Sequence, residues 1–527
     1  MIDRKRSENL PPGPRGLPII GNMLDVKSLL KKIQFHVRVW CYLAEIYGPV
    51  VHLKLIFGQS LIIVSGRNAI VEMLSRNEFD GRPNNFEIRL RTRGERRGLI
   101  FNDGDVWSEH RRFTVKTLKH LGFDKTNMED MILDDTVSLL KMIEKLADKK
   151  GPITEIYDLV SIAVIASFWF LITGSNCTFF VRFQLDQENP KLKEVIALMK
   201  ENVKGYNTAG RIINYLPFLR YIFPNLTGYT QIQERHNRMW LYFKKMIRIH
   251  DETKIQNEPT NLIDIYLNEM KMRCTNLSSP SCFNDENLIA LIRDLFVASI
   301  ETTTNTIGFV IAFLSVKQDI QKKIHDELDD VLGKDILPRL ANRNRLPYLQ
   351  ATLAEVARMG NVGPTSVPHR AINDATLLGY NIKKDSIMLA NFMSVHMDEN
   401  HWGDPNVFRP ERFINENGEY CDDPWIMTFG LGIRIYYAII IFINVSPYYT
   451  FIFFVYLLII IFSFCCTGRR RCPGEILAKN ILFLVTACML QKFYFAIAPG
   501  YPEPNLLGID GFTISPPPIN LVIKKRI

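Results

Sequence analysis

Two stretches of the sequence, taken together, decide which fold we expect. Residues 429–432 read Phe-Gly-Leu-Gly, and residues 469–474 read Arg-Arg-Arg-Cys-Pro-Gly. An ionised cysteine sulfur is a soft, electron-rich ligand for a transition metal. Pro473 follows Cys472 and suits the first position of a helix, whose positive end would favour negative charge on the sulfur. Taken alone, however, a single cysteine beside arginines is more often an ordinary residue, so the assignment of Cys472 as a metal ligand depends on the wider pattern.

An apolar segment, residues 433–467, separates these two stretches. After Arg434 it has no charged residue, and isoleucine, phenylalanine and tyrosine dominate it. Its length and apolarity suit a transmembrane helix, and an insertion within a soluble core is a further alternative. The interpretation that we favour is a translated intron, because AT-rich DNA encodes these residue types. Codons for Gly432 and for residues 467–468 can supply the splice signals, and removal of 433–467 keeps the reading frame.

Removal of the segment joins the two stretches into FGLG-RRRCPG. The joined string fits Phe-x-x-Gly-x-Arg-x-Cys-x-Gly, which resembles the haem-binding loop of the cytochrome P450 family. The resemblance implies that Cys472 is the thiolate ligand of haem b and that Arg470 pairs with a haem propionate. It also implies that Phe429 and Gly474 contact the cofactor. Glycine lets the backbone approach a sulfur and a porphyrin closely.

Two further motifs resemble the structural core of the family. Glu355-Val-Ala-Arg358 places an acid and a base three residues apart, where they share a helix face and can pair. The stretch Phe408-Arg-Pro-Glu-Arg412-Phe resembles the arginine element that follows. The resemblance implies that Glu355, Arg358 and Arg412 form a buried triad with charge-assisted arginine bonds. A surface ion pair is the alternative for an isolated Glu-x-x-Arg.

Two other motifs indicate contacts with the cofactor. Trp107-Ser-Glu-His-Arg111 resembles the Trp-x-x-x-Arg helix of the family, which implies that Trp107 and Arg111 reach one propionate. Val-Pro-His369-Arg resembles a segment whose histidine contacts a propionate. The alternatives are an amphipathic helix with a core tryptophan and an ordinary loop histidine.

The long apolar helix expected at 284–316 carries the candidate catalytic residues. Ala-Ser299-Ile-Glu301-Thr302-Thr resembles the acid–threonine element of the family, which implies proton delivery during oxygen activation. Threonines within a helix also tend to bond back to the main chain and distort it. Ser299 stands where the family usually has glycine. A polar stripe on a threonine-rich helix is the alternative.

Hydrophobic periodicity predicts a mainly α protein with small β-sheets. Strand patterns occur at 50–65, around Gly58, and at 363–394. The resemblance implies one large domain of the cytochrome P450 fold over 10–527, interrupted by the apolar segment. Residues 1–9 are expected to be a basic N-terminal remnant without an anchor. Helices are expected at residues 28–47, 129–174, 190–206, 229–254, 284–316, 318–332 and 475–490.

Composition excludes several classes of protein. The net charge of +9 is spread over 527 residues without a dense basic block, which argues against a nucleic-acid partner. An acidic protein partner or an anionic membrane surface fits this charge better. The nine cysteines include no CxxC pair, which argues against a disulfide framework and a structural zinc site.

The resemblance implies a haem-dependent monooxygenase that inserts one atom of dioxygen into a small apolar substrate, like a steroid or a foreign compound. Electrons would come from NADPH through NADPH-cytochrome P450 reductase, with cytochrome b5 as an optional second donor. The expected location is the cytosolic face of the endoplasmic reticulum membrane. One alternative is a non-catalytic or haem-deficient product, because 433–467 splits the haem loop. Another is a haem-thiolate isomerase, against which Glu301 and Thr302 argue.

Overall fold

The described part of the chain divides into two compact units, each assembled from several segments. Unit 1 comprises residues up to 83, 365–398 and 427–473, and unit 2 comprises 84–364, 399–426 and 474–527. The computed structural model describes residues 9–121, 126–149, 151–174, 212–252, 261–275, 282–431 and 469–526, with the single positions 197 and 259.

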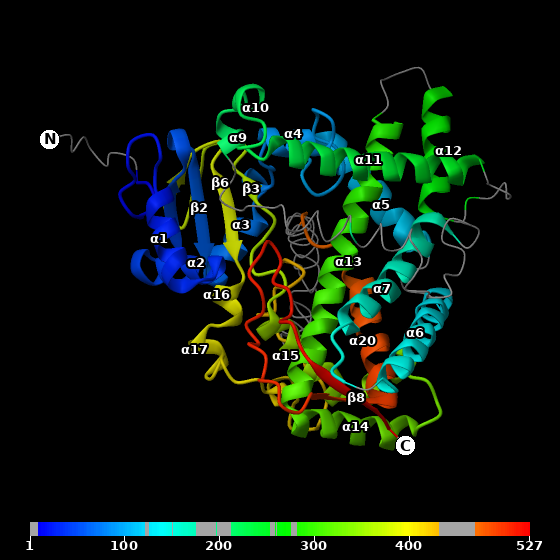
Figure 1. Ribbon diagram of the computed structural model, residues 1–527. Coiled ribbons are helices and arrows are strands. Elements are labelled where there is room, and N and C mark those ends of the chain that lie inside the picture. Colours follow the sequence, from blue (N-terminus) through cyan, green and yellow to red (C-terminus); the bar gives the residue numbers. More distant parts are fainter. Residues whose placement is uncertain are drawn as a thin grey trace, which may run out of the picture. The chain divides into compact units, whose positions relative to one another are not determined.

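A four-stranded sheet with the order β1-β2-β6-β3 organises unit 1 (Figure 1). β1 (Val50–Lys54) and β2 (Ser60–Ser65) form the antiparallel hairpin that the sequence predicts. β6 (Ile387–Asn391) lies parallel to β2, and β3 (His369–Arg370) lies antiparallel to β6. Residues 61–65 of β2, a central strand of this sheet, are buried on both faces.

Short helices and a second hairpin complete unit 1. The helix predicted at 28–47 is split at Gln34, which has φ of +59° and ends the first helix in a left-handed conformation. The elements are α1 (Met23–Ile33), α2 (His36–Tyr47), the 3-10 turns Ile56–Gly58 and Asn77–Phe79, α3 (Arg67–Ser75), β4 (Ala375–Leu377), β5 (Tyr380–Ile382) and α16 (Met393–His396).

The long helix α13 (Asp285–Val316) organises unit 2. It begins where the side chain of Asn284 accepts a hydrogen bond from the backbone N–H of Asn287 at 2.8 Å, as helix caps do. Most of its residues are buried, which explains its apolar character on all sides. It packs against α7 (Ile156–Thr173), α11 (Tyr229–Glu252), α15 (Pro347–Gly360), α20 (Glu475–Lys492) and β7 (Phe493–Ile497).

The helical pattern predicted over 129–174 forms two helices rather than one. The run consists of α6 (Thr126–Ala147) and α7, and Gly151, with φ of +108°, and Pro152 lie between them. A proline has no N–H for a helical bond, and this glycine conformation lies outside the helical region. Of the helix predicted at 190–206, only Ala197 is described, and it is helical.

The remaining elements of unit 2 agree with a mainly α protein that has small β-sheets, as predicted. β7 and β8 pair in an antiparallel manner. The other elements are α4 (Phe86–Arg91), α5 (Gly104–His120), α9 (Ile212–Tyr215), α10 (Leu219–Ile222), α12 (Leu262–Thr275), α14 (Gln318–Leu332), α17 (Glu399–Trp402), the 3-10 turns Leu340–Arg345 and Pro410–Phe413, and β8 (Leu521–Lys525).

Two of the described helices, α7 and α13, have the length and apolarity of a membrane span. Their apolar stretches are 72% and 67% buried within the protein. Core helices of large domains share this composition, so these two helices are weak evidence for a membrane crossing.

Candidate active site

The predicted ligand Cys472 lies in a loop of unit 1, and its thiol side chain is exposed. Its backbone N–H donates a hydrogen bond to the carbonyl of Phe429 at 3.0 Å. Between them along the chain, Gly430 has φ of +81°, a conformation that glycine adopts without strain. The two halves of the motif FGLG-RRRCPG are therefore in contact. Gly432 and the apolar segment 433–467 lie outside the described residues.

The helix that follows Cys472 begins where the apolar pattern of 475–490 predicts, and not at Pro473. α20 starts at Glu475 with Gly474 as its N-cap, so the expectation that Pro473 occupies the first helical position is wrong. The carbonyl of Gly474 accepts the first helical hydrogen bond, from Ala478 at 2.9 Å. Its φ of −93° is open to any L residue, so the backbone conformation alone does not require glycine here.

Arg470 and His369 lie near Arg82 in unit 1, and we call these three residues the basic cluster. The guanidinium of Arg470 donates two hydrogen bonds to the carbonyl of Asp80, at 3.0 and 2.7 Å. Burial lowers the pKa of His369 well below its ordinary value, and the charges of Arg82 and Arg470 lower it further. His369 is therefore neutral. Its Nδ1–H donates to the carbonyl of Phe79 at 2.7 Å, which leaves Nε2 as an acceptor.

Trp107 and Arg111 lie together on α5 in unit 2. The indole N–H of Trp107 donates to the carbonyl of Leu99 at 3.1 Å, and the ring is 3% exposed. The guanidinium of Arg111 lies 5.7 Å from the centre of the Trp107 ring, a cation–π distance. The indole N–H of Trp107 is thus already bound to Leu99, whereas the family resemblance implied that Trp107 contacts a haem propionate.

Asp294 on α13 holds the loop before α5, and none of the sequence motifs includes it. Its carboxylate accepts hydrogen bonds from the backbone N–H groups of Leu99 and Ile100, at 2.7 and 2.9 Å, and pairs with Arg91. The carboxylate lies so close to Gly98 that a Cβ there would come within 2.4 Å of it. Because Leu99 also accepts from Trp107, this buried acid links α13 to α5.

Glu301 and Thr302 lie on α13, and the carboxyl group of the first and the hydroxyl group of the second have different hydrogen-bond partners. Thr302 donates to the carbonyl of Ala298 at 2.9 Å, the backward bond expected of a threonine within a helix. Glu301 accepts a hydrogen bond from Thr513 at 2.5 Å. Burial raises the pKa of Glu301 from 4.5 to about 7, although the Thr513 bond acts in the opposite direction. Glu301 can therefore take up or release a proton near neutral pH.

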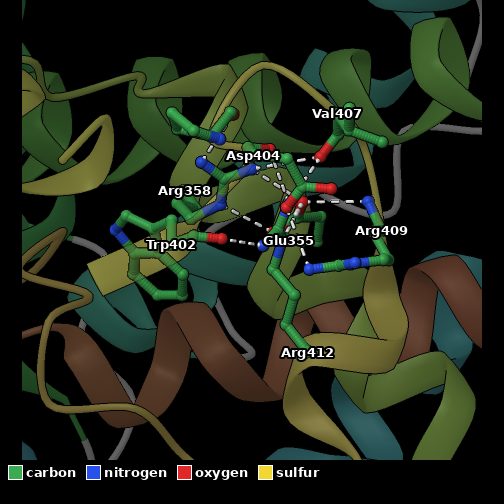
Figure 2. Close-up of polar contacts among 8 residues, drawn as sticks. Glu355, Arg358, Trp402, Asp404, Val407, Arg409 and Arg412 are labelled. Carbon is green, nitrogen blue, oxygen red and sulfur yellow. Dashed lines mark hydrogen bonds and ion pairs between the residues drawn. The ribbon is translucent and has the colours of Figure 1, made fainter. Parts of the chain in front are cut away.

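Figure 2 shows the ion-pair network around Glu355 on α15. Arg358 donates to both carboxylate oxygens of Glu355, each at 2.7 Å, and Arg412 donates to one of them at 3.3 Å. The side chains of Glu355 and Arg358 are 0% exposed and that of Arg412 is 5% exposed. The structure thus brings together the three residues that the sequence assigned to a buried triad.

The network has further members that the sequence did not indicate. The backbone N–H of Arg409 donates to Glu355 at 2.9 Å, and Arg412 pairs with Asp404 at 2.5 Å (Figure 2). The ring of Trp402 lies 5.1 Å below the guanidinium of Arg358. These contacts fasten the segment 402–412 to α15 and satisfy charges that would otherwise be costly to bury.

The mainly helical fold, the cysteine loop of unit 1, and the buried Glu–Arg–Arg triad and acid–threonine pair of unit 2 agree with the haem-thiolate class that the sequence motifs resemble. The family model for cytochrome P450 matches residues 11–435 and 462–523, so the chain belongs to the cytochrome P450 family. Members of this family are monooxygenases that bind haem through a cysteine thiolate.

The chain is similar to several curated members of the family over almost its whole length. It is 32% identical to farnesoate epoxidase of Bombyx mori, covering 99% of this chain and 95% of that protein. It is 30% identical to probable cytochrome P450 305a1 of Drosophila melanogaster, with the same two shares covered. It is also 30% identical to cytochrome P450 2J1 of Oryctolagus cuniculus, covering 98% and 91%.

Proposed function

We propose that the protein uses haem b, ligated by Cys472, to insert one atom of dioxygen into a small apolar substrate, with electrons that originate from NADPH. The observation that carries the proposal is the hydrogen bond between Phe429 and Cys472. The family match includes both halves of the haem-loop motif, residues 429–432 and 469–474. The name of the Bombyx mori relative makes an isoprenoid acid the first substrate to test. Steroids and foreign compounds remain further candidates of the same apolar class.

The residues of unit 1 fit a haem group. Cys472 offers an exposed thiol, and Arg470 and Arg82 supply positive charge that suits a propionate. The Thr428 hydroxyl, next to Phe429, is buried without a hydrogen-bond partner among the described residues, so it could donate to a bound group. Haem, when bound, supplies the activation of dioxygen. We also propose that Phe429, and Gly474 at the start of the last segment of unit 2, contact the haem. The Nε2 of His369 is an acceptor in this tautomer, so it would meet a propionate through a protonated carboxyl group or a bridging water.

In unit 2, we assign proton delivery to Glu301 and Thr302. A carboxyl group with a pKa of about 7 holds a proton in half of the molecules at neutral pH, which suits a general acid. The exposed hydroxyl of Thr302 can accept one proton and pass on another once its bond to Ala298 is exchanged. Trp107 and Arg111 hold the start of α5 against the Leu99 loop, and Arg111 keeps its positive charge for a cofactor carboxylate.

We predict that Glu301→Gln removes a pH-dependent step near neutrality. The folded-state pKa of Glu301 lies above its ordinary value of 4.5, so its contribution to folding is fully present below pH 4.5 and is lost as pH rises through about 7. The difference in unfolding free energy between wild type and Glu301→Gln should fall over this window. Denaturant titrations at several pH values and the pH profile of kcat measure the effect.

Glu286→Gln is the matched control, because Glu286 is an exposed carboxylate at the start of the same helix. In the control variant, the change of kcat with pH near pH 7 should be the same as in the wild type. A Glu301→Gln variant whose kcat profile and stability difference show no change between pH 5 and 8 would contradict the assignment.

For electron supply, we propose docking of NADPH-cytochrome P450 reductase, and optionally cytochrome b5, on a basic face of α5. Arg112, Lys116 and Lys119 are exposed there and are spaced four and three residues apart, so they share one side of the helix. Complementary charge between such a face and an acidic partner accelerates association. No nucleic-acid partner is proposed.

We place the protein on the cytosolic side of the endoplasmic reticulum membrane. The support from the structure is an exposed apolar set near the N-terminal end of unit 1, where Leu17, Ile19 and Leu24 are 52%, 67% and 54% exposed. Large apolar side chains that gather on a surface are typical of protein–protein or membrane contacts.

The reaction is tested with isotopically labelled dioxygen, NADPH, the reductase and an isoprenoid acid, using chains with and without residues 433–467. We expect one labelled oxygen atom in the product and the other in water, in the shorter chain at least. Product without label, or an isomer formed without NADPH, would contradict the monooxygenase proposal and favour the isomerase.

The second candidate function is a non-catalytic or haem-deficient product. The family match leaves out residues 436–461, which lie within the apolar segment 433–467, and this supports our proposal that the segment is an insertion into the domain of residues 10–527. Sequencing the transcript across codons 425–480 tests the intron interpretation. Mature messages that all retain the segment would contradict it.

A further inference from the structure

Three arginines of unit 2 line a hollow of about 590 Å³ that contains none of the predicted site residues. Arg89 lies on α4, Arg93 follows that helix, and Arg220 lies on α10. The amide side chains of Gln233 and Asn237, from α11, line the same hollow. Among the residues that the structure describes, no carboxylate forms an ion pair with any of these three arginines.

Aromatic rings, rather than acids, hold two of these guanidinium groups. Arg220 lies 4.6 Å from the centre of the Phe86 ring and 4.4 Å from that of Tyr221. Arg93 lies 5.4 Å from the centre of the Trp240 ring. Arg220 also donates one hydrogen bond, to the hydroxyl of Tyr221 at 2.6 Å. A cation–π contact orients a guanidinium through its face, so the other N–H groups at its edge can still donate.

The nearest acids along the chain have other partners. Glu87 accepts a hydrogen bond from Asn214 at 3.3 Å, and Glu95 pairs with Arg97 at 2.8 Å. Arg89 makes a single side-chain hydrogen bond, to the amide oxygen of Asn84 at 2.7 Å. The hollow therefore combines three positive charges with neutral amides, and its charge is complementary to an anion.

Apolar surface adjoins these charges. Phe86 and Leu90 line the hollow together with the arginines. The segment that supplies Arg220 continues into exposed apolar side chains, with Tyr221 75% and Leu226 86% exposed. A ligand that satisfies both features has an anionic end and an apolar chain.

We propose that this hollow binds the carboxylate of an amphipathic acid, whose apolar chain lies along Phe86 and Leu90. The planar guanidinium fork matches the two oxygens of a carboxylate, and such charge-assisted bonds are about twice as strong as neutral ones. Gln233 and Asn237 can donate further hydrogen bonds through their amide groups. The inference concerns binding alone, so it stands or fails separately from the oxidation chemistry.

Equilibrium dialysis of the full chain without NADPH tests the proposal, with dodecanoic acid, methyl dodecanoate and dodecyl phosphate as probes. We expect the acid to bind about tenfold more tightly than its ester, because the ester lacks the charge that two or more arginines recognise. In Arg89→Gln/Arg220→Gln this preference should fall to about threefold or less. The control Arg248→Gln/Lys271→Gln removes two charges from exposed positions of α11 and α12 and should keep the preference.

Three results would overturn the proposal. They are equal binding of acid and ester by the wild-type chain, an unchanged preference in Arg89→Gln/Arg220→Gln, and tighter binding of the phosphate than of the acid. Sedimentation with anionic vesicles distinguishes binding of an acid from binding of a membrane. If Arg89→Gln/Arg220→Gln lost vesicle binding but bound the acid as before, the arginines would be assigned to lipid headgroups.

Discussion

Replacing Cys472 with serine is expected to abolish the Soret band of thiolate-ligated haem and the NADPH-dependent oxidation. A serine hydroxyl stays protonated near neutral pH, and it lacks the polarisable sulfur that pushes electron density toward the iron. The test uses the chain without residues 433–467, in which we expect the haem loop to be continuous. The reduced carbon monoxide difference spectrum and the haem content per chain measure the effect.

Cys421→Ser provides the matched control, because Cys421 is also an exposed free cysteine among the described residues. The control variant should keep both the spectrum and the haem content. If Cys472→Ser retained the thiolate band while Cys421→Ser lost it, the assignment of the ligand would be wrong.

Glu355→Gln is expected to lower the free energy of unfolding by about 3–5 kcal/mol, the range for removing one partner of a buried ion pair. The Glu355 side chain is 0% exposed and accepts from Arg358, Arg412 and the backbone of Arg409. A neutral amide would remove the charge that compensates the buried guanidinium of Arg358, whereas Arg412 would keep its ion pair with Asp404. The NH2 group of the amide would also face N–H donors. Denaturant titration of both chains measures the difference.

Glu411→Gln is the control for this prediction. Glu411 pairs with Lys323 at 2.8 Å, but their side chains are 44% and 56% exposed. Ion pairs exposed to solvent contribute about 1 kcal/mol or less, so the control should be destabilised far less. Equal losses of stability in the two variants would contradict the structural role of the triad.

Local sequence patterns could predict those parts of the site that depend on contacts between residues close together in the sequence. Glu355 and Arg358 are three residues apart on a helix, so their pairing follows from helical geometry. The pairing of Arg412 with Glu355 could be predicted only from the family resemblance, because helix periodicity gives no information about a segment some fifty residues away. The hairpin of β1 and β2 was likewise predictable from its own residues, because a glycine separates two apolar runs.

Contacts between distant segments could not be predicted in this way. Thr513 donates to Glu301, and nothing in its sequence context indicates that partner. Asp294 lies in an apolar helix, yet its carboxylate is buried only because the backbone of Leu99 and Ile100 and the guanidinium of Arg91 surround it. The start of α20 at Glu475 depends on Gly474 as its cap, whereas proline preference alone favoured Pro473.

The neutral state of His369 is a further consequence of tertiary structure. Its ring is buried beside Arg82 and Arg470, and its Nδ1–H is bound to Phe79, so positive charge on the ring is disfavoured. The sequence shows a histidine next to an arginine, which is compatible with either protonation state. Only the surroundings decide between a donor and an acceptor at Nε2.

The reduced carbon monoxide difference spectrum, recorded on the chain as given and on the chain without residues 433–467, tests most directly whether Cys472 serves a haem. Phe429 and Cys472 are hydrogen-bonded although residues 433–467 separate them in the sequence, so deletion of these residues should leave the loop intact. We predict the Soret band typical of thiolate ligation in the shortened chain, and a weaker band or none in the chain as given. Absence of the band from both forms, with both folded, would contradict the assignment of this chain as a haem-thiolate monooxygenase.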